Sequence, residues 1–387
     1  MKKVVLFGAT GSIGRSTLAV LQKYSEEFSL LGITARTSIK KLKEIAEKFK
    51  VPYLVVEKEK DAEDLKKSLS YRAEVWWGEK GLEKLASLEE ADLCVIGISG
   101  IKGLIPSFFS LKTGKTVAIA NKESLIVAGD ILKNTLKKHK AKLIPVDSEH
   151  SALFQLLKKE RKRYVKKIYL TASGGPFYKI SREKFKEITP EQAIAHPTWK
   201  MGAKISVDSA TLMNKGFEVI EAKVLFNFSV DRIEVLIHPQ SIVHGLVEFI
   251  DGSFLAHMSV PDMKIAIAYA LTYPERKDLP VKVLDLTEIH TLTFEKPDFE
   301  KFPCLRMAFE AGKTGGIYPL ILEASDEVVV DAFLKRKISF DQIPYFIEKT
   351  LNEFKITSIK IESIFDILEI HKEVCKFVEE LINRNRS

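Results

Sequence analysis

The stretch VVLFGATGSIG, residues 4–14, decides the fold of this chain. A run of four apolar residues leads into Gly8, Gly11 and Gly14, and an amphipathic helical pattern follows. Glycines let the backbone turn tightly, and free N–H groups at the start of the next helix can hold a pyrophosphate. The spacing GxxGxxG is less specific than GxGxxG. Its position at the first strand-to-helix turn nevertheless favours a dinucleotide site over a purely structural turn.

Short apolar runs alternate with amphipathic segments from residue 1 to about residue 147. The runs predict strands at Val4–Phe7, Leu30–Thr34, Tyr53–Val56, Ala73–Trp77, Leu93–Ile96, Thr116–Ala120 and Leu143–Val146. Segments between them, such as Ser12–Tyr24 and Ser38–Lys50, predict helices. This alternation predicts an α/β fold in which helices cover both faces of a Rossmann-like parallel sheet. The ligand crevice is expected beyond the carboxyl ends of the strands.

The pattern changes after residue 147, and residues 148–273 predict an α+β domain that we expect to be catalytic. Its helices are predicted at Ser148–Glu160 and Ser209–Phe226. Its strands are predicted at Lys166–Ala172, Arg232–Ile237, Ile242–Ile250 and Phe254–Ser259, with a hairpin signal at Asp251-Gly252. Prolines punctuate a linker over residues 274–300, and residues 301–387 predict a small all-helical C-terminal domain.

The residues after the second predicted strand select the dinucleotide. An NAD site expects Asp or Glu there, to bind the ribose 2′-hydroxyl. The chain has TARTS at residues 34–38 instead, where Arg36 offers a guanidinium and Thr37 and Ser38 offer hydroxyls. These groups suit a 2′-phosphate, so the sequence predicts that domain 1–147 binds NADPH rather than NADH. The alternative is that Arg36 is an ordinary surface residue at a helix start.

Three carboxylates in two dense polar blocks predict a divalent-metal site. Asp147 and Glu149 follow the apolar run 143–146, and at i, i+2 on an extended segment they point the same way. Glu218 ends the polar block 206–218, which reads as part of a helix. Together they would form an oxygen-lined site of the kind that Mg²⁺ or Mn²⁺ prefers. For the first block, a strand end followed by an ordinary helix cap is the alternative.

Hydroxyl, amide and lysine side chains predict a monophosphate site. Ser173 lies in the glycine turn TASGGP, residues 171–176, whose bare N–H groups suit an anion. Ser209, Asn214 and Lys215 fall near one helix face or its first turn. Each of these residues taken alone favours a structural role over a functional one.

Two further segments are candidates. Asn121, Lys122 and Glu123 follow a predicted strand and face the crevice, where the lysine can hold a substrate hydroxyl or the cofactor. Its alternative role is a solvated lysine at a capped helix start. Trp199 lies in HPTWKMG, residues 196–202, which suits either a lid over the site or a packed loop anchor.

Bulk properties limit the class of protein. The chain has 387 residues, 45% of them apolar, which is enough for two or three domains. Its three cysteines form no CxxC pair, and no apolar run suits a signal peptide or a membrane span, so we expect a cytoplasmic protein without membrane contact. The net charge of +8 is spread over helix faces, and no DNA-binding module is evident, so nucleic acid is not an expected partner.

Taken together, these blocks resemble the 1-deoxy-D-xylulose 5-phosphate reductoisomerase family over the whole chain. The most specific segments are residues 8–14, 121–123, 147–150, 173–176, 196–218, 238–244 and 261–263. The resemblance implies conversion of this phosphosugar to 2-C-methyl-D-erythritol 4-phosphate with NADPH and Mg²⁺ or Mn²⁺, Co²⁺ being an alternative. It also implies a homodimer.

The resemblance further implies roles for single residues. The metal ligands would be Asp147, Glu149 and Glu218, and the catalytic residues would be Glu149, Lys122 and His196. The substrate would be bound by Ser148, Glu149, Ser173, His196, Trp199, Ser209, Asn214, Lys215 and Glu218. We expect NADPH to be contacted by Thr10, Gly11, Ser12, Ile13, Ala35, Arg36, Thr37, Asn121, Lys122, Glu123 and Gly202.

Two other classes of protein compete with this interpretation. A semialdehyde dehydrogenase needs a nucleophilic cysteine, and Cys94 lies inside an apolar run. A homoserine dehydrogenase would need no metal-dependent phosphate site. A non-catalytic dinucleotide sensor that binds nucleic acid would need a helix-turn-helix or winged-helix module.

Overall fold

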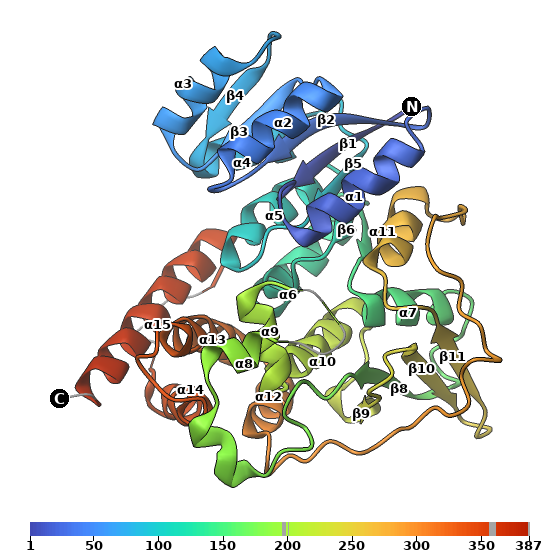
Figure 1. The fold of residues 1–387 in the computed structure, drawn as a ribbon, viewed down its shortest axis with the longest axis vertical. Helices are drawn as coiled ribbons and strands as arrows, with labels where there is room; N and C mark the ends of the chain where they lie inside the picture. The colour runs from blue at the N-terminus through green and yellow to red at the C-terminus, as the bar shows by residue number, and fades with distance from the viewer. Residues whose placement is uncertain (196–198, 200, 356–360, 386–387) are drawn as a thin grey trace. The chain divides into compact units, whose positions relative to one another are not determined.

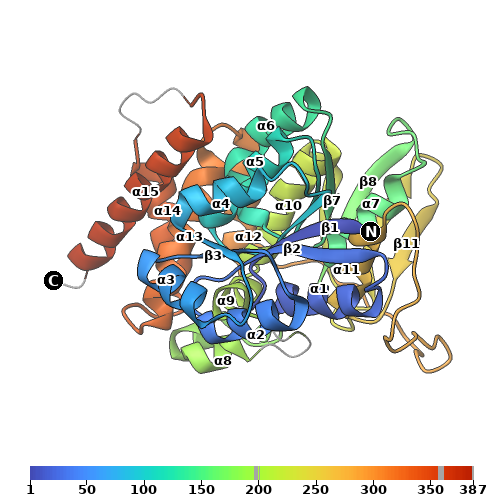
Figure 2. The same cartoon turned by 90° about the horizontal axis from the view of Figure 1, so that it is seen from above.

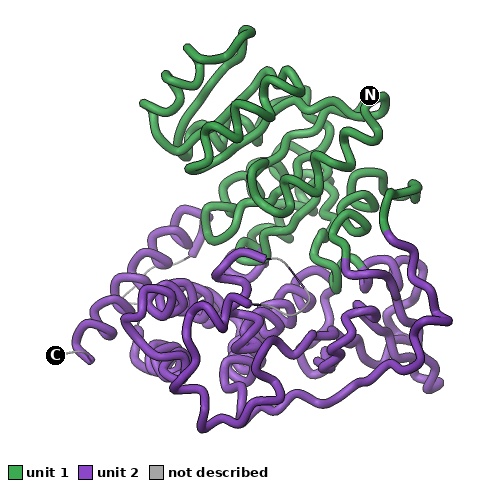
Figure 3. Tube along the Cα trace, in the orientation of Figure 1, with its two compact units in different colours: residues 1–124, 130–151, 262–281 green, residues 125–129, 152–261, 282–387 purple. Residues whose placement is uncertain are grey.

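The computed structural model describes residues 1–195, 199, 201–355 and 361–385. The chain divides into two compact units (Figure 3). The first unit consists of residues 1–124, 130–151 and 262–281. The second consists of residues 125–129, 152–261 and 282–387.

Within the described residues of the first unit, seven parallel strands form one sheet in the order β4-β3-β2-β1-β5-β6-β7. The strands are β1 (Lys2–Phe7), β2 (Phe28–Thr34), β3 (Tyr53–Val56), β4 (Glu74–Trp77), β5 (Leu93–Ile96), β6 (Thr116–Ile119) and β7 (Lys142–Pro145). The helices that follow them are α1 (Ser12–Lys23), α2 (Ile39–Phe49), α3 (Glu59–Ser68), α4 (Gly78–Ala86), η1 (Ile101–Gly103), α5 (Leu104–Lys112), α6 (Lys122–Lys138) and α7 (Ser148–Leu157).

Helices cover both faces of this sheet, as the sequence predicted. Figure 2 shows α1 and α2 on one side of the strands and α4 and α5 on the other. The strand order reverses between β1 and β5, which pair directly. A ligand crevice lies at such a reversal, beyond the carboxyl ends of the strands. The Rossmann-like prediction is therefore confirmed.

Burial on both faces explains why the last four residues of β1 are all apolar. Val4, Val5, Leu6 and Phe7 are all fully buried, because a covered parallel sheet leaves no solvated face to alternate with. A helix from far along the chain completes the cover. This helix, α11 (Met263–Thr272), packs against α1, β6 and β7.

The second unit contains a mixed four-stranded sheet in the order β11-β10-β8-β9 among its described residues (Figure 1). The strands are β8 (Val165–Ala172), β9 (Ile233–Ile237), β10 (Val243–Phe249) and β11 (Phe254–Met258). β8 and β9 are parallel, whereas β10 is antiparallel to both β8 and β11. Gly252, with φ +85°, turns the predicted hairpin between β10 and β11. All four strands match their predicted positions within a few residues.

The rest of the second unit is mainly helical. Its helices are η2 (Arg182–Glu187), α8 (Pro190–Ile194), α9 (Ala203–Ala210), α10 (Met213–Phe226), η3 (Val230–Arg232), α12 (Pro303–Thr314), α13 (Tyr318–Leu334), α14 (Gln342–Glu353) and α15 (Ile364–Arg384). α13 packs against α12, α14 and α15. The helical character predicted for the C-terminal region is confirmed.

One predicted helix is wrong. The segment predicted as a single helix over Ser209–Phe226 is divided between α9 and α10, and Leu212 stands between them with φ +59°. That conformation costs a leucine about 1–2 kcal/mol, and the burial of its side chain opposes this cost. Periodicity could not reveal the break, because the apolar pattern continues across it.

His238 ties the extended segment after residue 281 to the second sheet. Its Nδ1 lies 2.8 Å from the carbonyl oxygen of Thr293, and its Nε2 accepts the N–H groups of Ile242 and Val243, each at 3.2 Å. Two donors facing Nε2 fix the neutral tautomer that carries its proton on Nδ1. Burial lowers the pKa of His238, which keeps it neutral. Its role is therefore structural.

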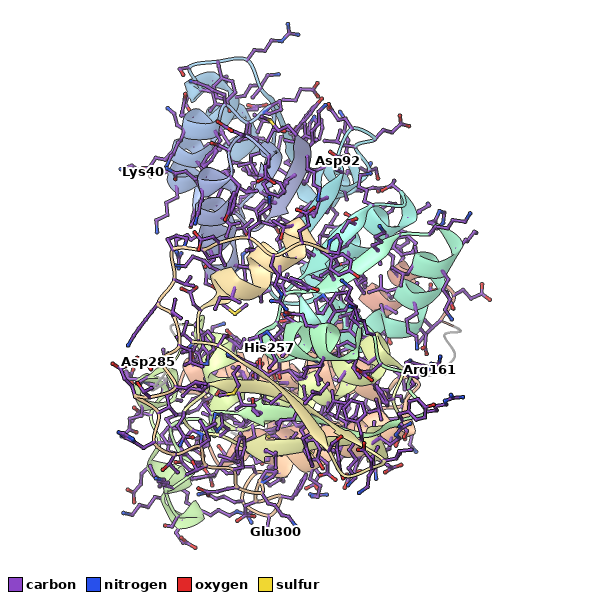
Figure 4. All side chains as sticks on the ribbon, turned by 90° about the vertical axis from the view of Figure 1, so that its right-hand side faces the viewer. Lys40, Asp92, Arg161, His257, Asp285 and Glu300 are labelled. Carbon is purple, nitrogen blue, oxygen red and sulfur yellow. The ribbon has the colours of Figure 1, made fainter. Side chains whose placement is uncertain are left out.

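The lysine-rich helix faces lie on the surface, as expected. Lys40 at the start of α2 is exposed, and its side chain projects outward in Figure 4. Among the described residues, none of the helices combines the length and the apolar character that crossing a membrane requires.

Candidate active site

At two of the three glycines in the first turn, a side chain would collide with neighbouring backbone atoms. Gly8 has φ +88°, and a Cβ there would lie 2.7 Å from the oxygen of Gly97. A Cβ at Gly14 would overlap the backbone oxygens of Gly8 and Ala9. Gly11 differs, because a Cβ there would meet only the Gly8 oxygen, at 3.5 Å. The protein leaves space at exposed Gly11 that a ligand can enter.

The start of α1 offers positive potential beside this turn. Its first turn holds no acidic residue, and none of the described side chains caps it. Ser12 and Ile13 therefore present backbone N–H groups at the positive end of the helix, an arrangement that binds anions. Arg15 adds a guanidinium, whose Nη1 donates to the Thr10 carbonyl at 3.0 Å. Sequence reasoning missed Arg15, although its spacing of four residues from Gly11 was visible.

The end of β2 lies against the same turn. Gly8 N–H donates to Thr34 Oγ1 at 2.8 Å, and Ala9 N–H donates to the Thr34 carbonyl at 2.9 Å. Ala35 is buried, whereas Arg36 and Thr37 are exposed. The residues predicted to hold the pyrophosphate and the 2′-phosphate are thus neighbours within one unit.

Asn121, after β6, has a clear structural role. It is 1% exposed, and its Nδ2 donates to the Gly100 carbonyl at 3.0 Å and to Glu123 Oε2 at 2.6 Å. Its Oδ1 accepts the Ser124 N–H at 3.2 Å and so caps α6. These bonds fix the backbone on both sides of Lys122.

Lys122 and the acidic block come together at the ends of the neighbouring strands β6 and β7. Lys122 Nζ lies 2.8 Å from Asp147 Oδ2, in a pair with side chains 8% and 19% exposed. The other Asp147 oxygen accepts the Ser148 N–H at 3.0 Å, and the Ser148 hydroxyl donates to Glu149. Lys122, Asp147, Ser148 and Glu149 therefore form one polar cluster. The predicted extended segment is wrong, because α7 begins at Ser148 and Glu149 lies in its first turn.

In the second unit, the glycine turn after β8 lies directly against α9. Gly175 has φ +68°, and a Cβ there would lie 2.5 Å from the Ser209 oxygen, so a larger residue would displace the turn. Gly175 N–H donates to Ser173 Oγ at 3.3 Å. The predicted phosphate residues Ser173 and Ser209 are thereby neighbours.

The first turns of α10 carry the remaining predicted polar residues of this unit. Asn214 Nδ2 donates to Glu218 Oε1 at 2.7 Å, and Lys215 forms an ion pair with the other oxygen of Glu218. Lys215 is 3% exposed and Glu218 is 1% exposed, so both charges depend on their partners. The N-cap residue of α10, Leu212, makes no side-chain cap, and Thr211 Oγ1 accepts the Met213 N–H at 3.3 Å.

Three further predicted residues belong to the segment that precedes α9. Gly202 is exposed before α9, and Trp199 is half-buried. His196 lies outside the described residues. Asp147 and Glu149 belong to the first unit and Glu218 to the second, so the three-carboxylate metal site stays a prediction.

The cysteines do not suit thiolate chemistry. Burial raises the pKa of the Cys94 thiol, on β5, to about 11. Burial also raises the pKa of Cys304, on α12, well above its usual range. Neutral buried thiols are poor nucleophiles, which disfavours the acyl-transferring semialdehyde alternative for both positions.

Three family models match most of the chain. The model described as 1-deoxy-D-xylulose 5-phosphate reductoisomerase matches residues 4–129, and that of its C-terminal domain matches residues 143–226. A model described as the DXP reductoisomerase C-terminal domain matches residues 258–377.

Relatives match over nearly full length. The 1-deoxy-D-xylulose 5-phosphate reductoisomerase of Thermodesulfovibrio yellowstonii is 49% identical over 369 residues, which cover 95% of this chain and 96% of the relative. The Zymomonas mobilis reductoisomerase, solved in complex with NADPH, has a TM-score of 0.92 and 38% identity over 98% of this chain and 99% of its own. A DOX-P reductoisomerase solved with NADPH, fosmidomycin and magnesium has a TM-score of 0.95 and 36% identity over 100% of both chains. This chain therefore belongs to the 1-deoxy-D-xylulose 5-phosphate reductoisomerase family.

Proposed function

We propose that this protein catalyses the NADPH- and divalent-metal-dependent isomerisation and reduction of 1-deoxy-D-xylulose 5-phosphate to 2-C-methyl-D-erythritol 4-phosphate, in isoprenoid precursor biosynthesis. Membership of the reductoisomerase family over nearly the whole chain carries this proposal. Solved relatives in complex with NADPH and with magnesium support both cofactors. The protein is accordingly an NADP-dependent oxidoreductase.

The glycine turn of the first unit fits NADPH. Gly11 leaves room for a pyrophosphate, and the start of α1 supplies uncapped N–H groups. We assign the pyrophosphate to Thr10, Gly11, Ser12 and Ile13, and the 2′-phosphate to Arg36 and Thr37 beside Ala35. The nicotinamide half would be contacted by Asn121, Lys122, Glu123 and Gly202.

Asp147, Glu149 and Glu218 are the proposed ligands of Mg²⁺ or Mn²⁺, with Co²⁺ as an alternative. The donor set fits a hard cation, because all three side chains offer carboxylate oxygens. Each of two of these carboxylates has a cationic neighbour, Lys122 beside Asp147 and Lys215 beside Glu218. When bound, the metal supplies Lewis acidity at the substrate carbonyl and NADPH supplies the hydride.

Proton transfer falls to the cluster at the ends of β6 and β7. Glu149 would take a proton from a substrate hydroxyl, while Lys122 and Ser148 hold the substrate's hydroxyls. The skeleton then rearranges, by retro-aldol cleavage and recombination or by a 1,2-shift, to 2-C-methyl-D-erythrose 4-phosphate. Reduction of that aldehyde completes the reaction.

The substrate's phosphate would be held in the second unit. Hydroxyls, an amide and an ammonium come from Ser173, Ser209, Asn214 and Lys215, at the Gly175 turn, at α9 and in the first turn of α10. We also propose that His196 contributes to this site and that Trp199 covers the bound substrate and excludes water from the reduction.

Purified protein tests the proposal directly. With 1-deoxy-D-xylulose 5-phosphate, NADPH and Mg²⁺ or Mn²⁺, the nicotinamide absorbance should fall and 2-C-methyl-D-erythritol 4-phosphate should accumulate. Excess EDTA should stop the reaction, and added metal should restore it. Full activity in EDTA would refute the metal role, and no NADPH consumption with any of the three metals would refute the function.

We also propose that the protein is a cytoplasmic homodimer. Strand β11 lies at the edge of the second sheet and exposes Phe254 and Leu255, which are 52% and 43% exposed, and Ile250 nearby is 64% exposed. An edge strand with apolar side chains suits pairing with a second copy. Sedimentation should give a dimer mass for the protein and a monomer mass for Leu255→Lys. A monomeric unmodified protein would contradict this.

The functional domains are proposed as the sequence suggested them. Residues 1–147 would bind NADPH, and residues 148–273 would carry the catalytic and metal residues. Residues 274–300 would link these to the helical domain 301–387. Limited proteolysis tests this division, because cleavage should concentrate within 274–300.

A further inference from the structure

A cluster of charged side chains lies where α9 packs against α13 in the second unit. Lys204 Nζ lies 2.8 Å from Asp208 Oδ2 and 2.6 Å from Asp326 Oδ2. Asp208 is 4% exposed and Asp326 is fully buried. With both carboxyl groups ionised, one lysine would face two negative charges inside the protein, an arrangement that burial strongly disfavours.

The second oxygen of each aspartate bears on the protonation state of the pair. Oδ1 of Asp208 and Oδ1 of Asp326 are both buried, and neither finds a donor among the described residues. The two side chains nevertheless meet at one cation, because Lys204 Nζ lies within 2.8 Å of an oxygen of each. Two carboxylates in contact can bond to each other only if one of them is protonated. One shared proton would therefore satisfy both oxygens and remove one charge.

Within the part of the chain that the structure describes, Lys204 is the one cation paired with the two aspartates. α10 contributes the ring of Phe217, 5.2 Å from Lys204 Nζ, and α12 contributes the neutral thiol of Cys304. Glu323, on α13, adds negative charge but is itself paired with His371 on α15, 3.0 Å away. Burial and the charge of Asp326 raise the pKa of Asp208 to about 8, and burial also raises the pKa of Asp326.

This cluster adjoins the proposed phosphate site. Asp208 directly precedes Ser209, whose backbone touches Gly175, and the chain then turns at Leu212 into the helix that carries Asn214 and Lys215. We propose that Asp208 and Asp326 share one proton, and that this pair, with Lys204, fixes α9 on α13 and so positions Ser209 for the substrate's phosphate. The inference rests on the proposed function. The three are positioning residues, since none is assigned a substrate contact.

The shared proton makes phosphate binding sensitive to alkali. Above the upper pKa of the pair both carboxyl groups ionise and repel, and α9 loses its anchor on α13. One pH unit above that pKa, only about a tenth of the molecules keep the proton, so KM for the phosphosugar should rise about tenfold. The affinity for NADPH should not change, because its proposed turn lies in the first unit.

The sign of the stability effect follows from the raised pKa. A folded state that keeps a proton which the unfolded chain has already lost becomes less stable as pH rises. The free energy of unfolding should therefore decrease as pH rises from the ordinary pKa of aspartate to about 8, and it should stay constant at higher pH.

Asp326→Asn tests the inference, because an amide of the same shape donates permanently to Asp208 and leaves its charge for Lys204. The variant should match the unmodified protein in KM at pH 7 and show no rise in KM to pH 9. It should also lose the infrared band of a buried protonated carboxyl group. If Asp326→Asn keeps both the alkaline rise in KM and the band, the shared proton is refuted.

Two further measurements keep the test decisive. Asp208→Asn should behave in the same way, because either amide replaces the proton. Asp326→Leu, which has no donor, should raise KM already at pH 7. If none of the proteins consumes the phosphosugar, the proposed function fails, but the infrared band and the pH dependence of melting still decide on the proton. If the unmodified protein lacks this infrared band at pH 7, the shared proton is refuted even if the variants fail to fold.

Discussion

Asn214 Nδ2 lies 2.7 Å from Glu218 Oε1, one turn along α10, while the neighbouring Lys215 pairs with the other oxygen of the same carboxylate. Two donors thus hold a buried side chain in one orientation. A carboxylate fixed in this way needs little rearrangement to bind a cation, which is the form of support that ligating residues receive in metalloproteins.

Glu218→Gln should therefore abolish metal-dependent NADPH consumption and leave NADPH binding intact. We expect kcat to fall at least about 100-fold, because loss of a supporting partner alone costs about 10–100-fold. Steady-state kinetics and NADPH fluorescence titration measure both effects. Glu221→Gln is the matched control, since Glu221 is equally buried on the same helix and lies outside the proposed site. Equal losses in the two variants would remove Glu218 from the metal site.

Gly11 and Gly14 should respond oppositely to alanine. Gly14→Ala places a methyl group against two backbone oxygens and should cost at least about 2 kcal/mol of unfolding free energy. Gly11→Ala meets no such barrier and should change stability by no more than about 1 kcal/mol. It should still weaken NADPH binding by at least about tenfold, because the methyl group fills the pyrophosphate space. Unchanged NADPH affinity in folded Gly11→Ala would exclude this turn as the cofactor site.

Arg36→Ala should reduce the preference for NADPH over NADH. Hydrogen bonds to charged groups contribute about 1.5–3 kcal/mol, so KM for NADPH should rise about 10–100-fold. KM for NADH should hardly change, because NADH lacks the 2′-phosphate. Lys48→Ala, an exposed lysine at the far end of α2, controls for the general loss of positive charge. A variant that retains its NADPH affinity would show that Arg36 is only a surface residue.

The buried pair of His371 and Glu323 should stabilise the helical region at neutral pH. Burial alone would lower the pKa of His371, but hydrogen bonds to Cys375 and Glu323 outweigh it and raise the pKa to about 10. A raised histidine pKa gives stability that is complete below about pH 6.5 and lost as pH rises through about 10.

Urea unfolding of the protein and of His371→Gln at pH 6, 8 and 10 measures this contribution. The variant should lose about 3–5 kcal/mol at pH 6, as expected when one partner of a buried ion pair is removed. The difference between the two proteins should shrink toward pH 10. A difference that does not depend on pH would mean that the histidine stays neutral.

The strands were predictable because their burial is visible in single short segments. Runs such as Val4–Phe7 are apolar throughout, and Asp251-Gly252 marks a hairpin that Gly252 indeed turns. The position of Lys122 at the carboxyl end of a strand was also predictable, and the structure places it beside Asp147 because the ends of adjacent parallel strands meet at one edge of a sheet.

What the sequence could not provide depends on contacts between distant segments. Asp208 and Asp326 are 118 positions apart by their numbers, and nothing in either segment reveals that one lysine joins them. The break between α9 and α10 at Leu212 was unpredictable for a different reason. A leucine rarely adopts a left-handed conformation, so only the surrounding packing specifies it.

Helix α11 has a consequence for how the protein forms in the cell. The first unit needs residues 262–281 as well as its N-terminal strands, since α11 packs on α1, β6 and β7. A ribosome must therefore synthesise nearly three-quarters of the chain before this unit can be completed. Nascent chains that stop after residue 151 should leave an apolar surface uncovered, and chaperones would recognise that surface until α11 emerges.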